Sequence, residues 1–369
     1  MIANQVLEKF EEGTVIANPS PGPRKAIVEL TTRCNLNCPM CFRQSWTEEL
    51  GDISEKLFKK ILLEFKEAGG EFLWLGGWGE PLIHKKAIEF AEMIKEEGLK
   101  LGINSNGLLL DEDKALKLIN IGLDRLVISI DASTQGIYEE IRGGDINELL
   151  RTLKFMHEAK KKMGKIYPKI EFSFTLMRRN MNELIPLIEL AASHGVNMIT
   201  ITNVIPVKKE FNCEKLYGEK KEEVERLIEK ASIKSLEANV GLKIPEFTLK
   251  TERSCPFVLN MASCVTWNGL VSPCFNFLHT YKCYIYNVEK TIKQVIFGNA
   301  TRESLSTIWR KQRYVQFRFR VRFFKYPSCT DCKFHEICHF TSTNELDCWG
   351  NAPSCADCLF SRGIILCPI

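Results

Sequence analysis

The sequence predicts an α/β fold: a partial parallel barrel of six βα units, resembling part of a TIM barrel, followed by a smaller cysteine-rich domain. From about Ala26 to Asn203, short apolar runs alternate with amphipathic segments, which is typical of repeated βα units. With 369 residues, 45% of them hydrophobic, the chain is long enough for a barrel-sized domain and a second one. The composition changes near Arg253, because eleven of the 15 cysteines lie from Cys255 onward. We therefore expect an N-terminal extension over residues 1–25, a barrel over 26–240 and a metal-containing domain over 250–369.

The predicted elements follow from local periodicity. Six runs rich in Ile, Val, Leu or Phe are the predicted strands: Ala26–Leu30, Phe72–Leu75, Lys100–Asn104, Arg125–Ile130, Lys169–Thr175 and Met198–Thr202. Amphipathic or charged stretches are the predicted helices: Glu55–Glu67, Lys86–Glu97, Glu112–Ile121, Glu148–Lys161, Glu183–His194 and Glu219–Glu237. Asp52 and Ser54 are the candidate N-caps of the first helix.

Composition excludes several classes of function. The first twelve residues contain acidic side chains where a secretory signal needs an apolar run, and nowhere do eighteen apolar residues follow one another. We therefore expect a cytoplasmic protein with no membrane partner. The net charge of +4, from 50 basic and 46 acidic residues, gives no reason to expect nucleic acid. In a reducing compartment, so many cysteines favour metal binding over the alternative, the disulfides of a hyperthermophile protein.

The first cysteine group is Cys34-x₃-Cys38-x₂-Cys41, directly after the first predicted strand. Parallel barrels carry their chemistry in such loops, at the carboxyl ends of the strands. A cubane iron–sulfur cluster normally takes four thiolates, so three leave one iron free to bind a small molecule. The alternative is a zinc knuckle that lacks one ligand.

This spacing at the end of a first barrel strand resembles the signature of the radical S-adenosylmethionine (SAM) family. The resemblance implies a [4Fe–4S] cluster held by Cys34, Cys38 and Cys41, with SAM on the open iron. It also implies an enzyme that cleaves SAM reductively and abstracts a hydrogen atom through a 5′-deoxyadenosyl radical. Met40 stands where the family more often has an aromatic residue against the adenine.

The ends of later predicted strands carry polar groups suited to the rest of SAM. Gly76-Gly77-Trp78-Gly79-Glu80-Pro81 resembles the family's Gly-Gly-Glu loop, which implies that Gly79 and Glu80 meet the methionyl ammonium. Asn106 lies in a turn similar to the family's Thr-Asn-Gly. Ser129 and Asp131 resemble its ribose-binding Ser-x-Asp pair, and we expect the two side chains to point the same way, as in a strand. Arg142 is a candidate partner for the SAM carboxylate, and Asn203 a weaker candidate.

The later cysteines resemble the SPASM extension of radical SAM enzymes, which implies two auxiliary [4Fe–4S] clusters. By analogy, one cluster takes Cys255, Cys264, Cys274 and Cys348. The other takes Cys329, Cys332 and Cys338 with one of Cys355, Cys358 and Cys367; the late ligands are not fixed by spacing, and Cys213 and Cys283 are left out. Two structural zinc sites are the alternative.

The segments Pro327–Cys332 and Asp347–Pro368 look like those of archaeal maturases associated with tungsten-containing aldehyde ferredoxin oxidoreductase. The resemblance implies that the substrate is the tungsten–pterin cofactor or its host enzyme, with reduced ferredoxin or a similar electron donor. The runner-up is a peptide or protein side-chain maturase. A non-catalytic iron–sulfur scaffold is the third alternative, although it would not need a SAM pocket. The basic, aromatic stretch Trp309–Lys325 is interpreted as a solvated face over the cluster domain, in preference to a phosphate site.

Overall fold

The computed structural model describes residues 5–10, 13–17, 20–218 and 221–367. Its centre is a ten-stranded sheet in the order β14-β11-β10-β3-β4-β5-β6-β7-β8-β9. The six strands β3 to β8 are parallel and match the six predicted strands to within two residues at each end: Lys25–Val28, Phe72–Leu75, Lys100–Ser105, Arg125–Ser129, Lys169–Leu176 and Met198–Asn203. The predicted partial barrel is therefore confirmed.

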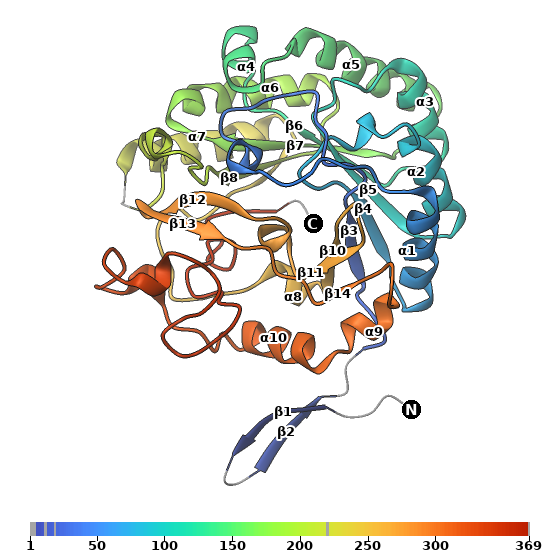
Figure 1. The fold of residues 1–369 in the computed structure, drawn as a ribbon. Helices are drawn as coiled ribbons and strands as arrows, with labels where there is room; N and C mark the ends of the chain where they lie inside the picture. The colour runs from blue at the N-terminus through green and yellow to red at the C-terminus, as the bar shows by residue number, and fades with distance from the viewer. Residues whose placement is uncertain (1–4, 11–12, 18–19, 219–220, 368–369) are drawn as a thin grey trace.

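Helices cover the outer side of the curved sheet (Figure 1). Five lie where the sequence predicts helices between strands: α1 (Glu55–Glu67), α2 (Ala87–Glu96), α3 (Glu112–Asn120), α5 (Ile146–Lys162) and α6 (Leu184–Ser193). Ser54 is the N-cap of α1, since its hydroxyl accepts a hydrogen bond from the amide of Leu57 at 3.2 Å. Helix α4 (Gln135–Arg142), a short helix after β6, was not predicted. Helix α7 (Glu222–Glu237) follows β8 and corresponds to the predicted charged helix Glu219–Glu237.

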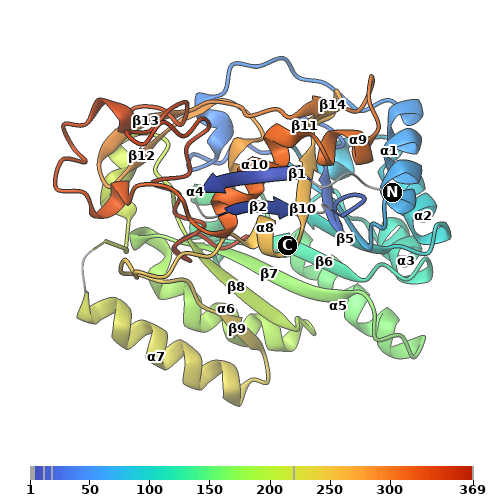
Figure 2. The ribbon, with the colours of Figure 1, turned by 90° about the horizontal axis from the view of Figure 1, so that it is seen from below.

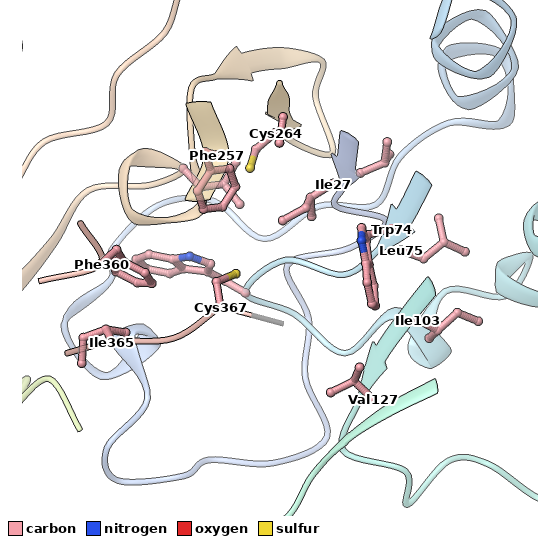
Figure 3. Close-up of a cluster of buried hydrophobic side chains, with 14 of the residues drawn as sticks. Ile27, Trp74, Leu75, Ile103, Val127, Phe257, Cys264, Phe360, Ile365 and Cys367 are labelled. Carbon is pink, nitrogen blue, oxygen red and sulfur yellow. The ribbon is translucent and has the colours of Figure 1, made fainter. Parts of the chain in front are cut away.

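The cysteine-rich part of the chain extends the barrel sheet at one edge. Strand β10 (Ala262–Val265) runs parallel to β3, and β11 (Leu270–Ser272) and β14 (Gly298–Asn299) continue that edge in antiparallel order. At the other edge, β9 (Gly241–Lys243) pairs with β8. Figure 3 shows Phe257 and Cys264 on one side, and Phe360, Ile365 and Cys367 on another, close to side chains of the barrel strands. The change of composition near Arg253 therefore does not interrupt the hydrophobic core.

The remaining elements are short. A separate hairpin joins β12 (Tyr281–Ile285) to β13 (Val288–Ile292), and α8 (Pro256–Leu259) precedes β10. The 3₁₀ helices are η1 (Phe42–Ser45), η2 (Pro81–Ile83), η3 (Arg178–Glu183), η4 (Lys209–Glu214), η5 (Phe275–Phe277), η6 (Cys329–Asp331) and η7 (His339–Thr341). In the described ranges, every helix is too short or too polar to cross a membrane.

The basic, aromatic stretch differs from the prediction of a solvated face. Its first residue, Trp309, ends α9 (Leu305–Trp309), and most of the rest forms α10 (Gln312–Arg322). Helix α10 buries apolar side chains on one face. Arg318 stacks on the ring of Trp309, with its guanidinium carbon 3.6 Å from the ring centroid, and donates a hydrogen bond to the Trp309 carbonyl. Burial lowers the pKa of Arg318 to about 10. Arg318 is therefore engaged in packing, because its guanidinium offers a flat cationic surface to the indole.

An N-terminal hairpin of β1 (Gln5–Phe10) and β2 (Gly13–Ala17) precedes the barrel, and β1 lies against α10 (Figure 2). The N-terminal extension, predicted over residues 1–25 as the segment ahead of the barrel, includes this hairpin.

Candidate active site

A cavity of about 310 Å³ opens at the carboxyl ends of the barrel strands. Parallel barrels present their loops for catalysis at this face. The cavity brings together nine of the side chains or glycines that the sequence predicts for the site: Cys34, Cys38, Met40, Cys41, Gly79, Glu80, Asn106, Ser129 and Arg142. They come from four different strand ends and from helix α4, so only the tertiary fold assembles them.

The three thiols of the first cysteine group lie close enough together to influence one another's charge. Burial raises the pKa of Cys38, and it raises that of Cys41 to about 11, with the neighbouring thiols adding to both effects. Two N–H donors face the sulfurs: Arg142 Nη1 is 3.9 Å from Cys38 Sγ and Asn106 Nδ2 is 4.0 Å from Cys34 Sγ. Buried thiols of this kind become ligands when a metal displaces the proton, and the two donors stabilise the resulting thiolates.

The chemistry of this group fits an iron–sulfur cluster. Cys34, Cys38 and Cys41 all line the cavity, and N–H donors face two of their sulfurs. Three thiolates beside an open cavity would hold three irons of a cubane and leave the fourth open to a small molecule.

The glycine-rich loop after β4 packs directly on the backbone that leads into the cysteines. A Cβ on Gly79 would lie 2.1 Å from the carbonyl oxygen of Thr31 and 2.7 Å from that of Arg33. The next amide, that of Glu80, donates to the Arg33 carbonyl at 2.8 Å. Glycine is needed at position 79 because the two backbones approach too closely for any side chain.

The Glu80 carboxylate is buried and held by three donors. Oε1 accepts from the amide of Leu82 at 3.1 Å and from the hydroxyl of Ser105 at 2.8 Å, and Oε2 accepts from the amide of Asn106 at 2.7 Å. Burial raises the pKa of Glu80 and these hydrogen bonds oppose that rise. A carboxylate has about four acceptor positions, so one remains for a cation in the cavity.

Asp131 is engaged by groups of the protein itself. Strand β6 ends at Ser129, which lines the cavity, whereas the side chain of Asp131 is completely buried. Its Oδ2 is 2.5 Å from Nη2 of Arg142, and its Oδ1 accepts from the amide of Thr175 at 2.6 Å. Asp131 therefore holds Arg142, which itself reaches the cavity, and its ribose-binding role stays a prediction.

The opposite wall of the cavity combines neutral polar side chains with apolar residues of the cysteine-rich part. None of the strand-end motifs predicts this wall, which consists of Ser173, Thr175, Thr202, Val204, Ile205, Phe275, Phe360, Ile365 and Leu366. Asn203 also lines it, and its Nδ2 donates to the carbonyls of Glu246 at 3.1 Å and Ile364 at 2.9 Å. The hydroxyl side chains on β7 and β8 were a detectable signal, since polar residues interrupt two apolar strands there.

The later cysteines agree only in part with the predicted ligand sets. Burial raises the pKa of Cys274, Cys355 and Cys358, and nearby thiols add to the rise: Cys255 and Cys358 for Cys274, and Cys255 for Cys358. Cys355 lies near Cys255, Cys274 and Cys358. Cys348, assigned by analogy to the Cys255 set, lies near Cys329. Cys264 lies near Cys274, as in the predicted set, and near Cys367, which reaches the cavity wall. Spacing alone could not decide these groups, because it does not say which distant cysteines meet.

Comparisons with known proteins agree with this geometry. The family model of the radical SAM superfamily matches residues 28–191, and that of the SPASM iron–sulfur cluster-binding domain matches residues 255–333. Over 352 residues, the chain is 36% identical to the tungsten-containing aldehyde ferredoxin oxidoreductase cofactor-modifying protein of Pyrococcus furiosus; the match covers 93% of this chain and 96% of that protein. It is 27% identical over 270 residues to a probable GTP 3′,8-cyclase of Methanocaldococcus jannaschii, covering 68% of this chain and 84% of that one.

Among solved structures, Streptococcus suis SuiB bound to its precursor peptide SuiA matches with a TM-score of 0.65 and 18% identity. The match covers 87% of this chain and 72% of SuiB. A likeness at this level of identity supports the fold and nothing further.

Proposed function

The chain belongs to the radical SAM superfamily and carries a SPASM iron–sulfur domain, and on that premise we propose that it matures a tungsten enzyme. The proposed substrate is the tungsten–pterin cofactor of aldehyde ferredoxin oxidoreductase, or the polypeptide that holds it. The observation that carries the proposal is the 36% identity to a protein named for this modification, which extends over 93% of the chain. The cavity supports the radical chemistry, and the similarity supports the substrate.

In this proposal Cys34, Cys38 and Cys41 hold the [4Fe–4S] cluster that makes the chain a SAM-cleaving enzyme. When bound, the cluster supplies the electron that breaks a carbon–sulfur bond of SAM, and a 5′-deoxyadenosyl radical then abstracts a hydrogen atom. The chain's own contribution is to shield and polarise the site. Asn106 and Arg142 direct N–H groups at two of the sulfurs, and such donors tune the potential of a cluster.

The SAM-binding roles follow the positions in the cavity wall. Glu80 takes the methionyl ammonium at its remaining acceptor position, and Gly79 keeps the loop close to the cysteines. Arg142 takes the SAM carboxylate, while Ser129 and Met40 face the nucleoside. Asp131 acts indirectly in this proposal, because its ion pair fixes the orientation of Arg142.

We assign the auxiliary clusters by proximity. Cys255, Cys274, Cys355 and Cys358 form one proposed ligand set. Cys329, Cys332, Cys338 and Cys348 form the other, in which Cys348 completes a set whose first three members are close in sequence. Both sets number four thiolates, as a fully ligated cubane requires. Cys264 and Cys367 stay outside these sets, at the boundary between the barrel and the cysteine-rich part. Reduced ferredoxin or a similar small electron carrier is the proposed donor.

The test uses the anaerobically reconstituted protein with SAM, a reductant and aldehyde ferredoxin oxidoreductase isolated from a host strain that lacks this protein. We expect 5′-deoxyadenosine, a changed mass of the pterin or the polypeptide, and restored aldehyde oxidation. The Cys38→Ala variant should give none of the three, whereas Cys213→Ser, at an exposed position outside both ligand sets, should give all of them.

Two outcomes would redirect the proposal. If the oxidoreductase from the deletion strain is fully active with an unchanged cofactor, the substrate is wrong and a peptide or protein maturase becomes the preferred function. If protein with a full complement of iron forms no 5′-deoxyadenosine with any substrate, a cluster scaffold is the better description.

A further inference from the structure

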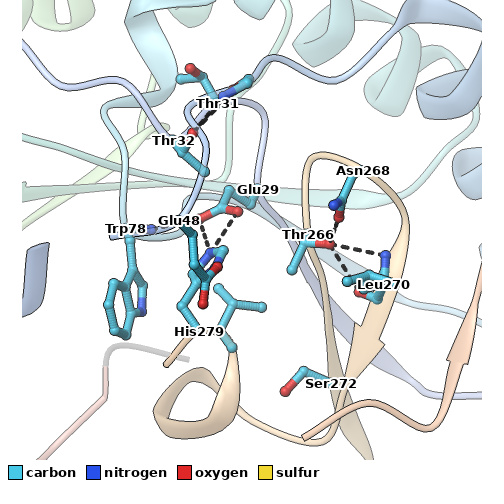
Figure 4. A network of polar contacts seen from close by, with 12 residues as sticks. Glu29, Thr31, Thr32, Glu48, Trp78, Thr266, Asn268, Leu270, Ser272 and His279 are labelled. Carbon is cyan, nitrogen blue, oxygen red and sulfur yellow. Dashed lines mark hydrogen bonds and ion pairs between the residues drawn. The ribbon is translucent and has the colours of Figure 1, made fainter. Parts of the chain in front are cut away.

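Three charged side chains, two of them buried, connect the cysteine-rich part to the barrel at the edge of the active site (Figure 4). Glu29 follows strand β3 and is completely buried. Nε2 of His279 lies 3.1 and 3.0 Å from the two oxygens of Glu29, and Nδ1 of His279 lies 2.7 Å from Oε2 of Glu48. His279 itself is 2% exposed and belongs to the segment between η5 and β12. Three segments far apart in sequence thus meet at one imidazole.

The buried Glu29 carboxylate has a compensating charge from His279 only when the imidazole carries a proton on each ring nitrogen. The two carboxylates are the titratable groups that face the imidazole, and the remaining neighbours are aromatic: the rings of Trp46 and Trp78 lie 4.5 and 5.1 Å from it, centroid to centroid. Burial lowers the pKa of His279, but Glu29 and Glu48 outweigh it and raise the pKa to about 9. At neutral pH the imidazolium therefore compensates the buried charge of Glu29.

Glu29 in turn determines where the glycine-rich loop lies. Its Oε1 accepts a hydrogen bond from the amide of Trp78 at 3.0 Å. A Cβ on Gly77 would lie 2.6 Å from Cγ of Glu29, so the loop backbone runs directly over this side chain. Glu80, two residues after Trp78, then reaches the cavity. A shift of Glu29 would move the loop that carries Glu80.

We propose that His279 is a positioning residue for the SAM-binding loop at residues 76–81 and that it acts through Glu29. In consequence, a residue of the cysteine-rich part that does not itself line the cavity influences the SAM affinity of the barrel. The proposal rests on the proposed function, in which Glu80 binds the ammonium of SAM. A merely structural role would change stability and leave SAM binding alone, and the two roles are separable by experiment.

The experiment compares His279→Gln with the wild-type protein, both anaerobically reconstituted, by equilibrium dialysis with labelled SAM and by iron analysis. Glutamine keeps a donor toward Glu29 and removes the charge. We expect unchanged iron and a SAM dissociation constant raised about tenfold or more, because a misplaced carboxylate loses a charge-assisted hydrogen bond. His194→Gln is the matched control, since His194 bonds to the Leu190 carbonyl on α6, and it should bind SAM normally.

The pH dependence of SAM binding distinguishes a positioning role of His279 from a merely structural one. The wild-type affinity for SAM should fall as pH rises through about 9, where His279 loses its proton, beyond the effect of SAM's own ionisation. That extra fall should be missing in His279→Gln. Glu48→Gln is a milder change at a partly exposed carboxylate. In this variant the fall in SAM affinity should occur at lower pH, because one of the two carboxylates that raise the His279 pKa is gone. This second variant keeps the proposal testable if His279→Gln does not fold.

The Glu80→Gln variant tests whether the loop binds SAM separately from whether His279 positions the loop. If it weakens SAM binding while folded His279→Gln binds SAM within twofold of wild type, the positioning role is refuted and the assignment of the loop stands. If Glu80→Gln leaves the affinity unchanged, the loop does not bind SAM, and both the assignment and the proposal fail. An unmoved pH profile in Glu48→Gln would also refute the positioning role.

Discussion

Replacing Asp131 distinguishes the position that the structure gives this residue from the one that its sequence motif predicts. Its carboxylate is 0% exposed and the side chain of Arg142, 2.5 Å away, is 13% exposed, so the ion pair is withdrawn from water. In Asp131→Asn, Arg142 keeps its charge without a counter-ion. Removing one partner of a buried pair costs about 3–5 kcal/mol of unfolding free energy.

This cost converts into a measurable change in melting temperature. With an unfolding entropy of about 2.1 cal/mol/K per residue, a chain of 369 residues should melt roughly 4–6 °C lower. The assay is anaerobic calorimetry of the reconstituted protein at a fixed scan rate, with iron measured before each run. Asparagine retains an oxygen for the Thr175 amide, so the change reports mainly on the lost charge.

A double-mutant cycle with Arg142→Gln supplies the control. With both charges gone, the double variant should lose less unfolding free energy than the two single variants together. The difference, which is the coupling energy, should be about 0.5–3 kcal/mol. If Asp131→Asn melts within 1 °C of wild type and instead binds SAM about tenfold more weakly, Asp131 contacts the ribose directly. The position described above would then be wrong, and the motif-based prediction correct.

Two further predictions concern the metal content and the charged group at the barrel edge. Anaerobically reconstituted protein should bind about twelve irons per chain, from three cubanes, and about eight after Cys34, Cys38 and Cys41 are replaced together; stoichiometric zinc with little iron in the purified protein would contradict the ligand sets. The His279 pKa rises from 6.5 to about 9 on folding, so its stabilisation is complete below about pH 6.5 and disappears as pH rises through about 9. Wild-type protein should lose on the order of 3 kcal/mol of unfolding free energy over that interval in pH-dependent calorimetry, and an equal loss in His279→Gln would show that other groups titrate.

The sequence alone determined the features that depend on local spacing. Apolar periodicity located all six barrel strands, because a buried parallel strand needs a continuous run of β-branched and aliphatic residues. The three cysteines from Cys34 to Cys41 had to lie near one another because they share one short loop. Each motif at a strand end also had to reach the same face, since all six strands run in one direction.

Contacts between distant segments were decided only by the tertiary structure. Asp131 pairs with Arg142 because helix α4 brings the guanidinium to the end of strand β6 as a buried counter-charge. Cys348 lies near Cys329, 19 residues earlier in the chain, and the spacing of the cysteines does not specify which of them meet. His279 meets Glu29 although 250 residues separate them, because β10 pairs with β3 and carries the following segment to the edge of the active site. Because Glu29 is buried, its charge is stable only where the fold places a partner of opposite charge, and His279 is that partner.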